Sequence, residues 1–563
     1  MLPGAHSDVD VESHQISTTI VGVNRELEKQ IRAFIGEDFS INSENLPEKI
    51  DQMVDDAKKS LTALGYYEAQ VDAEHSTYKN NTVVKLNVRR GKPVRISNIE
   101  LVITGDAATH KEFQSLIGSL PIKKGQAFNH GDYERTKDLL HSNARNLGYF
   151  DAKFDRAQVL ITRRSLSAKV YIEFDSGKRH RIKNIQYETT LFDDAFLKRW
   201  QPFGENIPYR ASHALNLTQN LQNSGYFKFV RVRPQSEVTN GTDIPLVVEL
   251  EPARENVMSI GLGYATDTDL RIKASWLRPH HNDKGHILKA DTSISRLSQE
   301  ISASYQIPHK RSPATGKYTL NFGILNHRTE DTFSQLRTLN ISDQRLTKRD
   351  WYRDIFLRWE NENTDDGNDR INLLLPGFSF SRTKSSGGIK PGKGTFYSFR
   401  ALGASTKLLS DINMLRLTAA AKKLKSWKKR HYLITRLDLG ILNTQSFSRV
   451  PPSHRFFAGG DSSVRGFEYQ SISPINNDGE ATGGKFLTTA SAEYNFYFRD
   501  RWAIAGFIDA GRAFIDFDAP YRAGVGAGLR WLSPVGPLRI DLAVGISEEE
   551  KPYRLHLAIG PQL

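Results

Sequence analysis

Apolar residues recur at helical spacing three times in the first half of the chain. Residues three or four positions apart lie on one face of a helix, so each stripe predicts a helix with one buried side. Each stripe ends at or just before a glycine, Gly65, Gly148 or Gly225, which is typical of a left-handed residue that ends a helix. The stripes consist of Ile50, Val54, Ala57, Leu61 and Leu64; of Tyr133, Leu140, Ala144 and Leu147; and of Ala214, Leu217, Leu221 and Ser224.

The segments around these glycines are repeats of one another. ALGYYEAQV from Ala63, NLGYFDAKF from Asn146 and NSGYFKFVRV from Asn223 share a Gly-Tyr-aromatic core. A second pair, GKPVRISNI from Gly91 and GKRHRIKNI from Gly177, keeps the same period. Two motifs in one register indicate a duplicated β-α-α-β-β unit. We therefore expect an N-terminal tail at 1–14 and three domains at 15–92, 93–178 and 179–253.

After Pro252 the pattern changes to two-residue alternation. In VMSIGLGYAT and LRIKASWL, apolar side chains fall on one face and polar or small ones on the other. Transmembrane β-strands alternate in this way and take about 9 to 11 residues each. Residues 254–563 have room for sixteen such strands with their connections. The predicted fold is thus α+β followed by an antiparallel, all-β transmembrane barrel, with a soluble β-sandwich as the alternative.

The composition argues against membrane-spanning helices and against a nucleic-acid-binding role. No run approaches the 18 apolar residues of a membrane helix, so none is expected. The opening MLPGAHSDVDVES lacks a basic and an apolar signal region, so a secretory signal is absent or already removed. The net charge is +13, but acids and bases are mixed along the chain. The basic run Lys422–His431 is expected to be a solvated turn beside a membrane, and no nucleic-acid partner is predicted.

Motifs for catalysis are missing from the sequence. The chain has no cysteine and contains no G-x-S-x-G, H-E-x-x-H or G-x-x-x-x-G-K-[ST] motif. His280, His281 and His286 lie close in sequence but have no carboxylate at ligand spacing. We therefore expect a non-enzyme with no catalytic residue, metal site or cofactor.

Three C-terminal segments resemble a known family. FFAGGDSSVRGFEYQSISP from Phe456, GFIDAG from Gly506 and the ending AIGPQL are similar to signature segments of the BamA/TamA superfamily of outer-membrane assembly factors, and to TamA most closely. The resemblance implies three POTRA domains in the periplasm and a 16-stranded barrel in a bacterial outer membrane. It also implies insertion of autotransporters and other β-barrel clients. The expected partners are unfolded clients, outer-membrane lipids and a TamB-like, inner-membrane-anchored protein.

A second function stays open at this point. A polypeptide-secreting outer-membrane transporter of the two-partner secretion type would also combine such domains with a barrel. The presence of three repeats and the lack of an N-terminal plug helix argue against it.

The resemblance suggests a role for one arginine. Strand alternation turns Glu493 and Asp509 toward the barrel interior, beside an inner strip of glycines at Gly524, Gly526 and Gly528. In the family, the signature arginine lies against acids of the inner wall. By position, Arg465 would meet Asp509 and also Glu493, which would lock the loop inside the barrel. The predicted loop-locking motif comprises Val464, Arg465, Gly466 and Phe467.

The first and last strands are expected to form a weak seam. The first strand contains Gly261 and Gly263, and the last ends in Gly560 followed by a proline, which cannot donate to a β-ladder. Taken alone, such glycines are ordinary strand irregularities. The resemblance implies a lateral gate at this seam, where a client strand could pair.

Overall fold

The computed structural model describes residues 13–36, 39–42, 45–79, 81–189, 191–235, 241–267, 269–329, 331–364, 370–388, 390–534 and 536–559. Most of the predicted tail and the seam residue Gly560 lie outside these ranges. Contacts group the chain into two compact units, and residues of the third repeat belong to both.

The first repeat packs two helices on one face of a four-stranded sheet, with strand order β2-β1-β4-β3. Asn24 caps α1, because its side chain accepts the Leu27 N–H at 2.9 Å. Ile31 of α1 and Leu61 of α2 are buried against Leu86 of the sheet. Its elements are β1 (Ser13–Val21), α1 (Arg25–Ile35), β2 (Phe39–Asn42), α2 (Leu46–Ala63), β3 (Gln70–Tyr78) and β4 (Asn81–Arg89).

In the second repeat, all of whose residues are described, no strand lies between the two helices, and the three strands are arranged β5-β7-β6. Helix α4 ends at Gly148, whose φ is 93°. A Cβ on Gly148 would lie 2.9 Å from the Cβ of Tyr209, so both conformation and space require glycine. The elements are β5 (Arg95–Thr104), α3 (Lys111–Ile117), α4 (His130–Leu147), β6 (Lys153–Thr162) and β7 (Ser167–Asp175).

The third repeat has a short strand, β9, between its two helices, as the first repeat has β2. Its sheet has the order β10-β11-β8-β9. Leu217 and Leu221 of α6 are fully buried, as their helical spacing predicts. Among the described residues, no helix has the length and apolar character needed to cross a membrane. The elements are β8 (Arg181–Glu188), α5 (Asp194–Lys198), β9 (Ile207–Pro208), α6 (Ala211–Asn223), β10 (Phe227–Pro234) and β11 (Asp243–Pro252).

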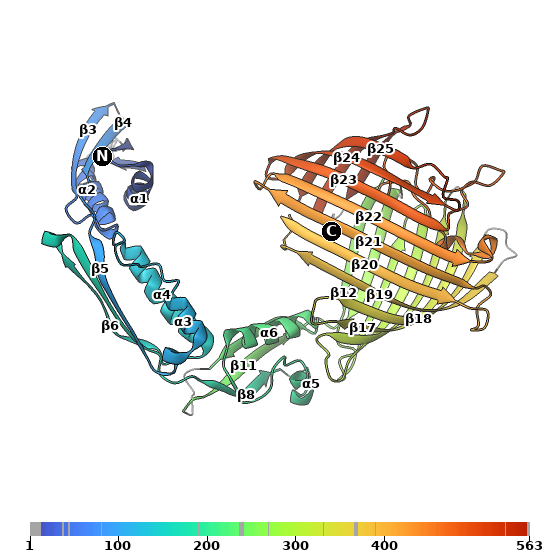
Figure 1. The fold of residues 1–563 in the computed structure, drawn as a ribbon, viewed down its shortest axis with the longest axis horizontal. Helices are drawn as coiled ribbons and strands as arrows, with labels where there is room; N and C mark the ends of the chain where they lie inside the picture. Colours follow the sequence, from blue (N-terminus) through green and yellow to red (C-terminus); the bar gives the residue numbers. More distant parts are fainter. Residues whose placement is uncertain are drawn as a thin grey trace, which may run out of the picture. The chain divides into compact units, whose positions relative to one another are not determined.

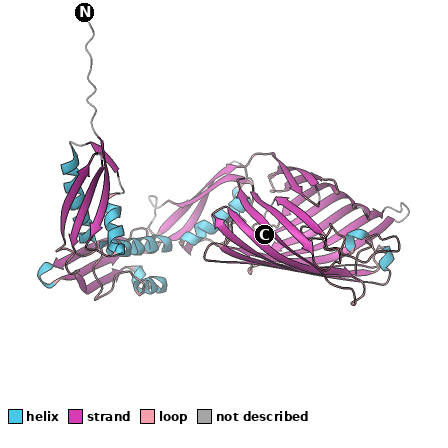
Figure 2. Cartoon of the chain, turned by 90° about the horizontal axis from the view of Figure 1, so that it is seen from above, coloured by secondary structure: helices cyan, strands magenta, loops and turns pink. Residues whose placement is uncertain are grey.

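Sixteen antiparallel strands, β12 to β27, close into a barrel (Figure 1). Strands alone build its wall, as Figure 2 shows by their magenta colour. The predicted fold class is confirmed. The strands are β12 (Val257–Ala265), β13 (Asp269–Arg278), β14 (Ile287–Ile294), β15 (Ser298–Pro308), β16 (Gly316–Arg328), β17 (Phe333–Leu346), β18 (Tyr352–Thr364), β19 (Arg370–Ser385), β20 (Lys393–Ala404), β21 (Met414–Trp427), β22 (His431–Thr444), β23 (Phe486–Arg499), β24 (Trp502–Phe514), β25 (Arg522–Ser533), β26 (Gly536–Gly545) and β27 (Tyr553–Ile559).

Alternation sorts apolar residues to the outside of the barrel and polar residues to the inside. In β24, Ile504 and Ile508 are about half exposed, whereas Asp509 is fully buried. One expectation is corrected: the basic run from Lys422 is not mainly a turn. Residues 422–427 belong to β21 and only 428–430 form the turn, because lysine stems can cover an inner wall while a strand continues.

Candidate functional site inside the barrel

The long connection from β22 to β23, residues 445–485, turns back into the barrel and is held by inward-facing side chains. Near its start, His454 Nε2 lies 2.6 Å from Glu360 Oε2 of β18. Further along, the guanidinium of Arg436 donates to the carbonyls of Ser462 and Ser463. These contacts hold the part of the loop that precedes its tip. We call residues 445–485 the inner loop.

Arg465 lies at the tip of the inner loop and is 6% exposed. Its Nε and Nη2 donate to the two carboxylate oxygens of Asp509, at 2.7 and 3.0 Å. Its Nη1 donates to Glu493 at 2.8 Å and to Asp541 at 3.1 Å. The guanidinium also lies over the ring of Phe507, 3.4 Å from its centroid. The two parallel hydrogen bonds to Asp509 fix the orientation of the guanidinium as well as pairing its charge.

A second arginine completes this group of charges. Arg530 of β25 donates through Nε to Glu493 at 3.1 Å and also pairs with Asp541. Two guanidinium groups therefore share three carboxylates, and all five side chains are buried. We call Arg465, Arg530, Glu493, Asp509 and Asp541 the arginine cluster.

The sequence analysis did not identify Arg530 and Asp541. The signal was present, because Leu529 and Trp531 face outward, and this turns Arg530 inward. The same alternation in β26 turns Asp541 inward between Ile540 and Leu542.

The other residues of the predicted motif each have a structural reason for their type. Val464 and Phe467 pack with Ala458 and Ile472 in a small apolar cluster within the inner loop. Gly466 has φ 93°, and a Cβ there would lie 2.8 Å from the Gly545 backbone nitrogen. Glycine is therefore needed at this position for both conformation and space.

The three glycines of β25 face the inner loop and the barrel interior. A Cβ on Gly524 would lie 1.9 Å from the carbonyl oxygen of Arg465. On Gly526 it would meet the ring of Phe507 at 2.3 Å, and on Gly528 the carboxylate of Asp541 at 1.8 Å. The strip without side chains thus lets the loop tip approach the wall.

The seam between the first and last strands is narrow. Within the described residues, β12 and β27 share one Cα pair, Ala265 with Ala558. The Leu557 N–H donates to the Thr266 hydroxyl oxygen at 2.6 Å just beside it. Gly261 and Gly263 have nothing within 4 Å of a built Cβ, so no packing contact requires glycine there. The third predicted seam residue, Gly560, lies outside the described ranges.

The histidines near the start of the barrel have separate contacts. His280 Nε2 lies 3.1 Å from the carbonyl oxygen of Ala253, and His286 Nδ1 lies 2.6 Å from the hydroxyl of Tyr305. Among the described residues, these imidazoles do not appear in any group with the spacing of metal ligands.

Comparisons with known proteins agree with this architecture. Residues 254–562 match the Omp85 superfamily domain, residues 17–90 match POTRA domain TamA domain 1, and residues 94–177 match the POTRA model described as surface antigen variable number repeat. The outer membrane protein assembly factor BamA of Nitratidesulfovibrio vulgaris is 23% identical over 553 residues, which cover 91% of this chain and 68% of that protein.

A solved structure of BamA shares the fold. The crystal structure of BamA from Haemophilus ducreyi lacking POTRA domains 1–3 has a TM-score of 0.68 at 17% identity, covering 83% of this chain and 99% of that one. CdiB from Acinetobacter baumannii has a TM-score of 0.48 at 13% identity, covering 92% and 99%. The protein belongs to the Omp85 superfamily, as an outer-membrane β-barrel with POTRA domains in the periplasm.

Proposed function

We propose that this protein helps client β-barrel proteins insert into the outer membrane by opening sideways at the seam between β12 and β27. The observation that carries the proposal is that, within the described residues, β12 and β27 share a single Cα pair. Neighbouring strands elsewhere share up to fourteen pairs, as β21 and β22 do. Opening the barrel here costs far fewer backbone hydrogen bonds than opening it at another joint.

The edge of β12 has the properties of a template for another strand. Met258, Ile260 and Leu262 are 77%, 81% and 72% exposed, and within the described residues β27 pairs with β12 only at Ala265. Outward residues in the continuous wall are less exposed; Ile504, for example, is 54% exposed. A free edge with an apolar outer face can accept an extended client strand by main-chain hydrogen bonds.

The POTRA domains would supply the docking arm. Their sheets end in free edge strands, such as β3 in the first domain and β6 in the second. These edges favour binding of unfolded outer-membrane clients and of a TamB-like, inner-membrane-anchored protein. The match of the first domain to a TamA-type model supports TamA-like activity on autotransporters. The protein would do this without catalytic chemistry or a cofactor.

Reconstitution tests the proposal against the transporter alternative. Purified protein is placed in liposomes and given an unfolded β-barrel client, and client folding is followed by its altered gel mobility. Insertion predicts folded client in the bilayer at a rate well above that of empty liposomes. Client protected from protease inside the vesicles but not folded in the membrane would overturn the proposal and indicate polypeptide secretion.

A further inference from the structure

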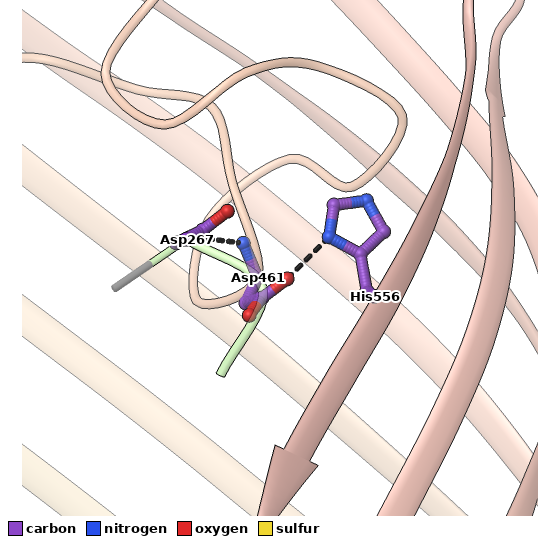
Figure 3. Close-up of side chains that lie close together, drawn as sticks. All are labelled: Asp267, Asp461 and His556. Atoms are coloured by element: carbon purple, nitrogen blue, oxygen red, sulfur yellow. Dashed lines mark hydrogen bonds and ion pairs between the residues drawn. The ribbon is translucent and has the colours of Figure 1, made fainter. Parts of the chain in front are cut away.

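Three ionisable side chains from distant parts of the chain meet beside the seam (Figure 3). Asp267 lies in the turn after β12, Asp461 in the inner loop and His556 in β27. The backbone N–H of Asp461 donates to Asp267 Oδ2 at 2.6 Å. His556 Nδ1 contacts Asp461 Oδ1, and the Gly466 N–H donates to His556 Nε2 at 3.0 Å. We call Asp267, Asp461 and His556 the seam cluster.

The hydrogen bonds of His556 define its tautomer. Because Nε2 accepts the Gly466 N–H, the neutral ring carries its proton on Nδ1 and donates it to Asp461. The ligand atoms of the three residues lie within 4.8 Å of one another, a spacing that could suit a metal ion. Both ring nitrogens are already engaged by the protein, however, so the donor set does not fit a metal ligand.

Within the described part of the chain, the carboxylates of Asp267 and Asp461 leave one buried oxygen without a hydrogen-bond donor. Oδ2 of Asp461 is buried and has no hydrogen-bond partner among the described residues. Asp267 is also partly buried, and one of its carboxylate oxygens lies within 4.8 Å of a carboxylate oxygen of Asp461. Two close carboxylates disfavour double ionisation, and a proton shared between them would give Oδ2 of Asp461 a donor.

We propose that the seam cluster is a proton-dependent clasp: one proton shared by Asp267 and Asp461 fastens the inner loop to the first hairpin, while His556 fastens it to the last strand. The clasp thereby closes the seam where the backbone ladder is nearly absent. Its role in controlling the seam rests on the proposed lateral opening, whereas its pH dependence is a property of the cluster itself.

The sign of the pH dependence follows from Asp267. Burial first, and the charge of Asp461 second, raise the pKa of Asp267 to about 6. A carboxyl whose pKa is raised in the closed state binds its proton more tightly there than in the open state. Acidification through pH 6 therefore stabilises the closed state, and this gain is lost as the pH rises above 6.

Other charged groups face Asp267 and also affect its pKa, so the test must separate their effects from that of Asp267. His556 and Arg554 of β27 both lower the pKa of Asp267, and Arg554 is also paired with Glu468 of the inner loop at 2.9 Å. Burial first, and the charge of Asp267 second, raise the pKa of Tyr469 of the same loop.

The test measures seam opening in the full-length protein in liposomes. Ala265→Cys, in this cysteine-free chain, reports access to the seam through its rate of thiol labelling between pH 5 and 7.5. Ala490→Cys on the β23 wall corrects for the pH dependence of the reagent. We expect the corrected rate to be about tenfold lower at pH 5 than at pH 7.5, because one pKa unit corresponds to a factor of ten in equilibrium.

Two variants assign the effect to the cluster. Asp267→Asn cannot ionise, so its labelling should stay slow at pH 7.5 and lose its pH dependence. His556→Gln, which replaces the imidazole with an amide, should keep the step near pH 6, because that step belongs to Asp267. The clasp is wrong if Asp267→Asn keeps the wild-type profile, or if the corrected rate rises on acidification. A pH-dependent seam with unchanged client insertion would support the clasp and count against the proposed insertion mechanism.

Discussion

The barrel wall and its seam are held by different forces. Between β21 and β22 the backbone ladder runs from Met414 with Thr444 to Trp427 with His431. Between β12 and β27 the ladder is one Cα pair within the described residues, and side chains of the inner loop lie beside it. The wall is stabilised by repeated main-chain hydrogen bonds, whereas the described contacts beside the seam are a few hydrogen bonds that involve Thr266, Asp267 and His556.

The inner loop connects these two regions. Its Arg465 is held by acids of β23, β24 and β26, on the continuous wall. Four residues earlier, Asp461 contacts the turn after β12 and the last strand. The inner loop is thus fixed to the continuous wall through Arg465 and contacts the seam through Asp461. The seam could therefore open while the loop stays bound to the wall.

The largest effect is expected from joining the seam covalently. Cα partners across antiparallel strands are about 4.5 to 5.5 Å apart, within the range of a disulfide. Ala265→Cys with Ala558→Cys should abolish client insertion under oxidising conditions, and reductant should restore it. Leu262 and Leu557 are less suitable, because Leu557 lies beside Thr266.

The matched control places a disulfide in the wall. Ala490→Cys with Ala510→Cys also joins two alanines that are Cα partners, but across β23 and β24. This variant should insert clients at the wild-type rate. Full activity with both joints oxidised would exclude lateral opening.

Next in size is the removal of the guanidinium of Arg465. Arg465→Ala leaves the fully buried Asp509 without its ion-pair partner, at a cost of about 3 to 5 kcal/mol. The barrel should still insert, since the ladders are unchanged, but the inner loop should become sensitive to protease and client insertion should fall. Limited proteolysis and the client-folding assay measure both effects.

Arg449→Ala is the control, because Arg449 is an exposed arginine of the same loop. It should behave as wild type in both assays. If Arg465→Ala is indistinguishable from Arg449→Ala, the motif does not lock the loop.

A smaller effect is expected from adding one methyl group to the wall. Gly524→Ala places a Cβ against the carbonyl of Arg465, so loop and strand must move apart, at about 1 to 3 kcal/mol. Loop proteolysis should be intermediate between wild type and Arg465→Ala. A loop as protected as that of wild type would show that the contact relaxes without cost.

The smallest effect is expected from the same methyl at the seam. Gly263→Ala adds a Cβ into open space, so the free energy of unfolding should change by no more than about 0.5 kcal/mol. The temperature of barrel unfolding should therefore stay near that of wild type. Unfolding by heat, followed by gel mobility, measures this. Strong destabilisation would mean that the edge of β12 is packed after all.

Much of the architecture could be predicted from periodicity. The stripe through Leu217 and Leu221 identifies α6, and alternation in β24 correctly turns Asp509 inward. Both patterns can be read from a short stretch of sequence, because buried residues recur every three or four positions in a helix and every second position in a strand. The basic run from Lys422 was interpreted wrongly, because charged residues on consecutive positions hide the alternation of β21.

The clusters could be predicted only in part. Alternation can turn Asp541 inward, but only the register of β25 with β26 brings its carboxylate to Arg530. The seam cluster depends on still longer-range geometry: Asp267 and His556 meet because Ala265 pairs with Ala558, nearly three hundred residues later. No local pattern encodes such a closure.

The complete burial of Asp509 has a kinetic consequence for the folding of this protein itself. An ionised Asp509 buried without a guanidinium partner is costly. We therefore expect the tip of the inner loop to bind while β23 to β26 assemble. Withdrawal of the loop would leave the same carboxylate without its partner, at a cost of about 3 to 5 kcal/mol.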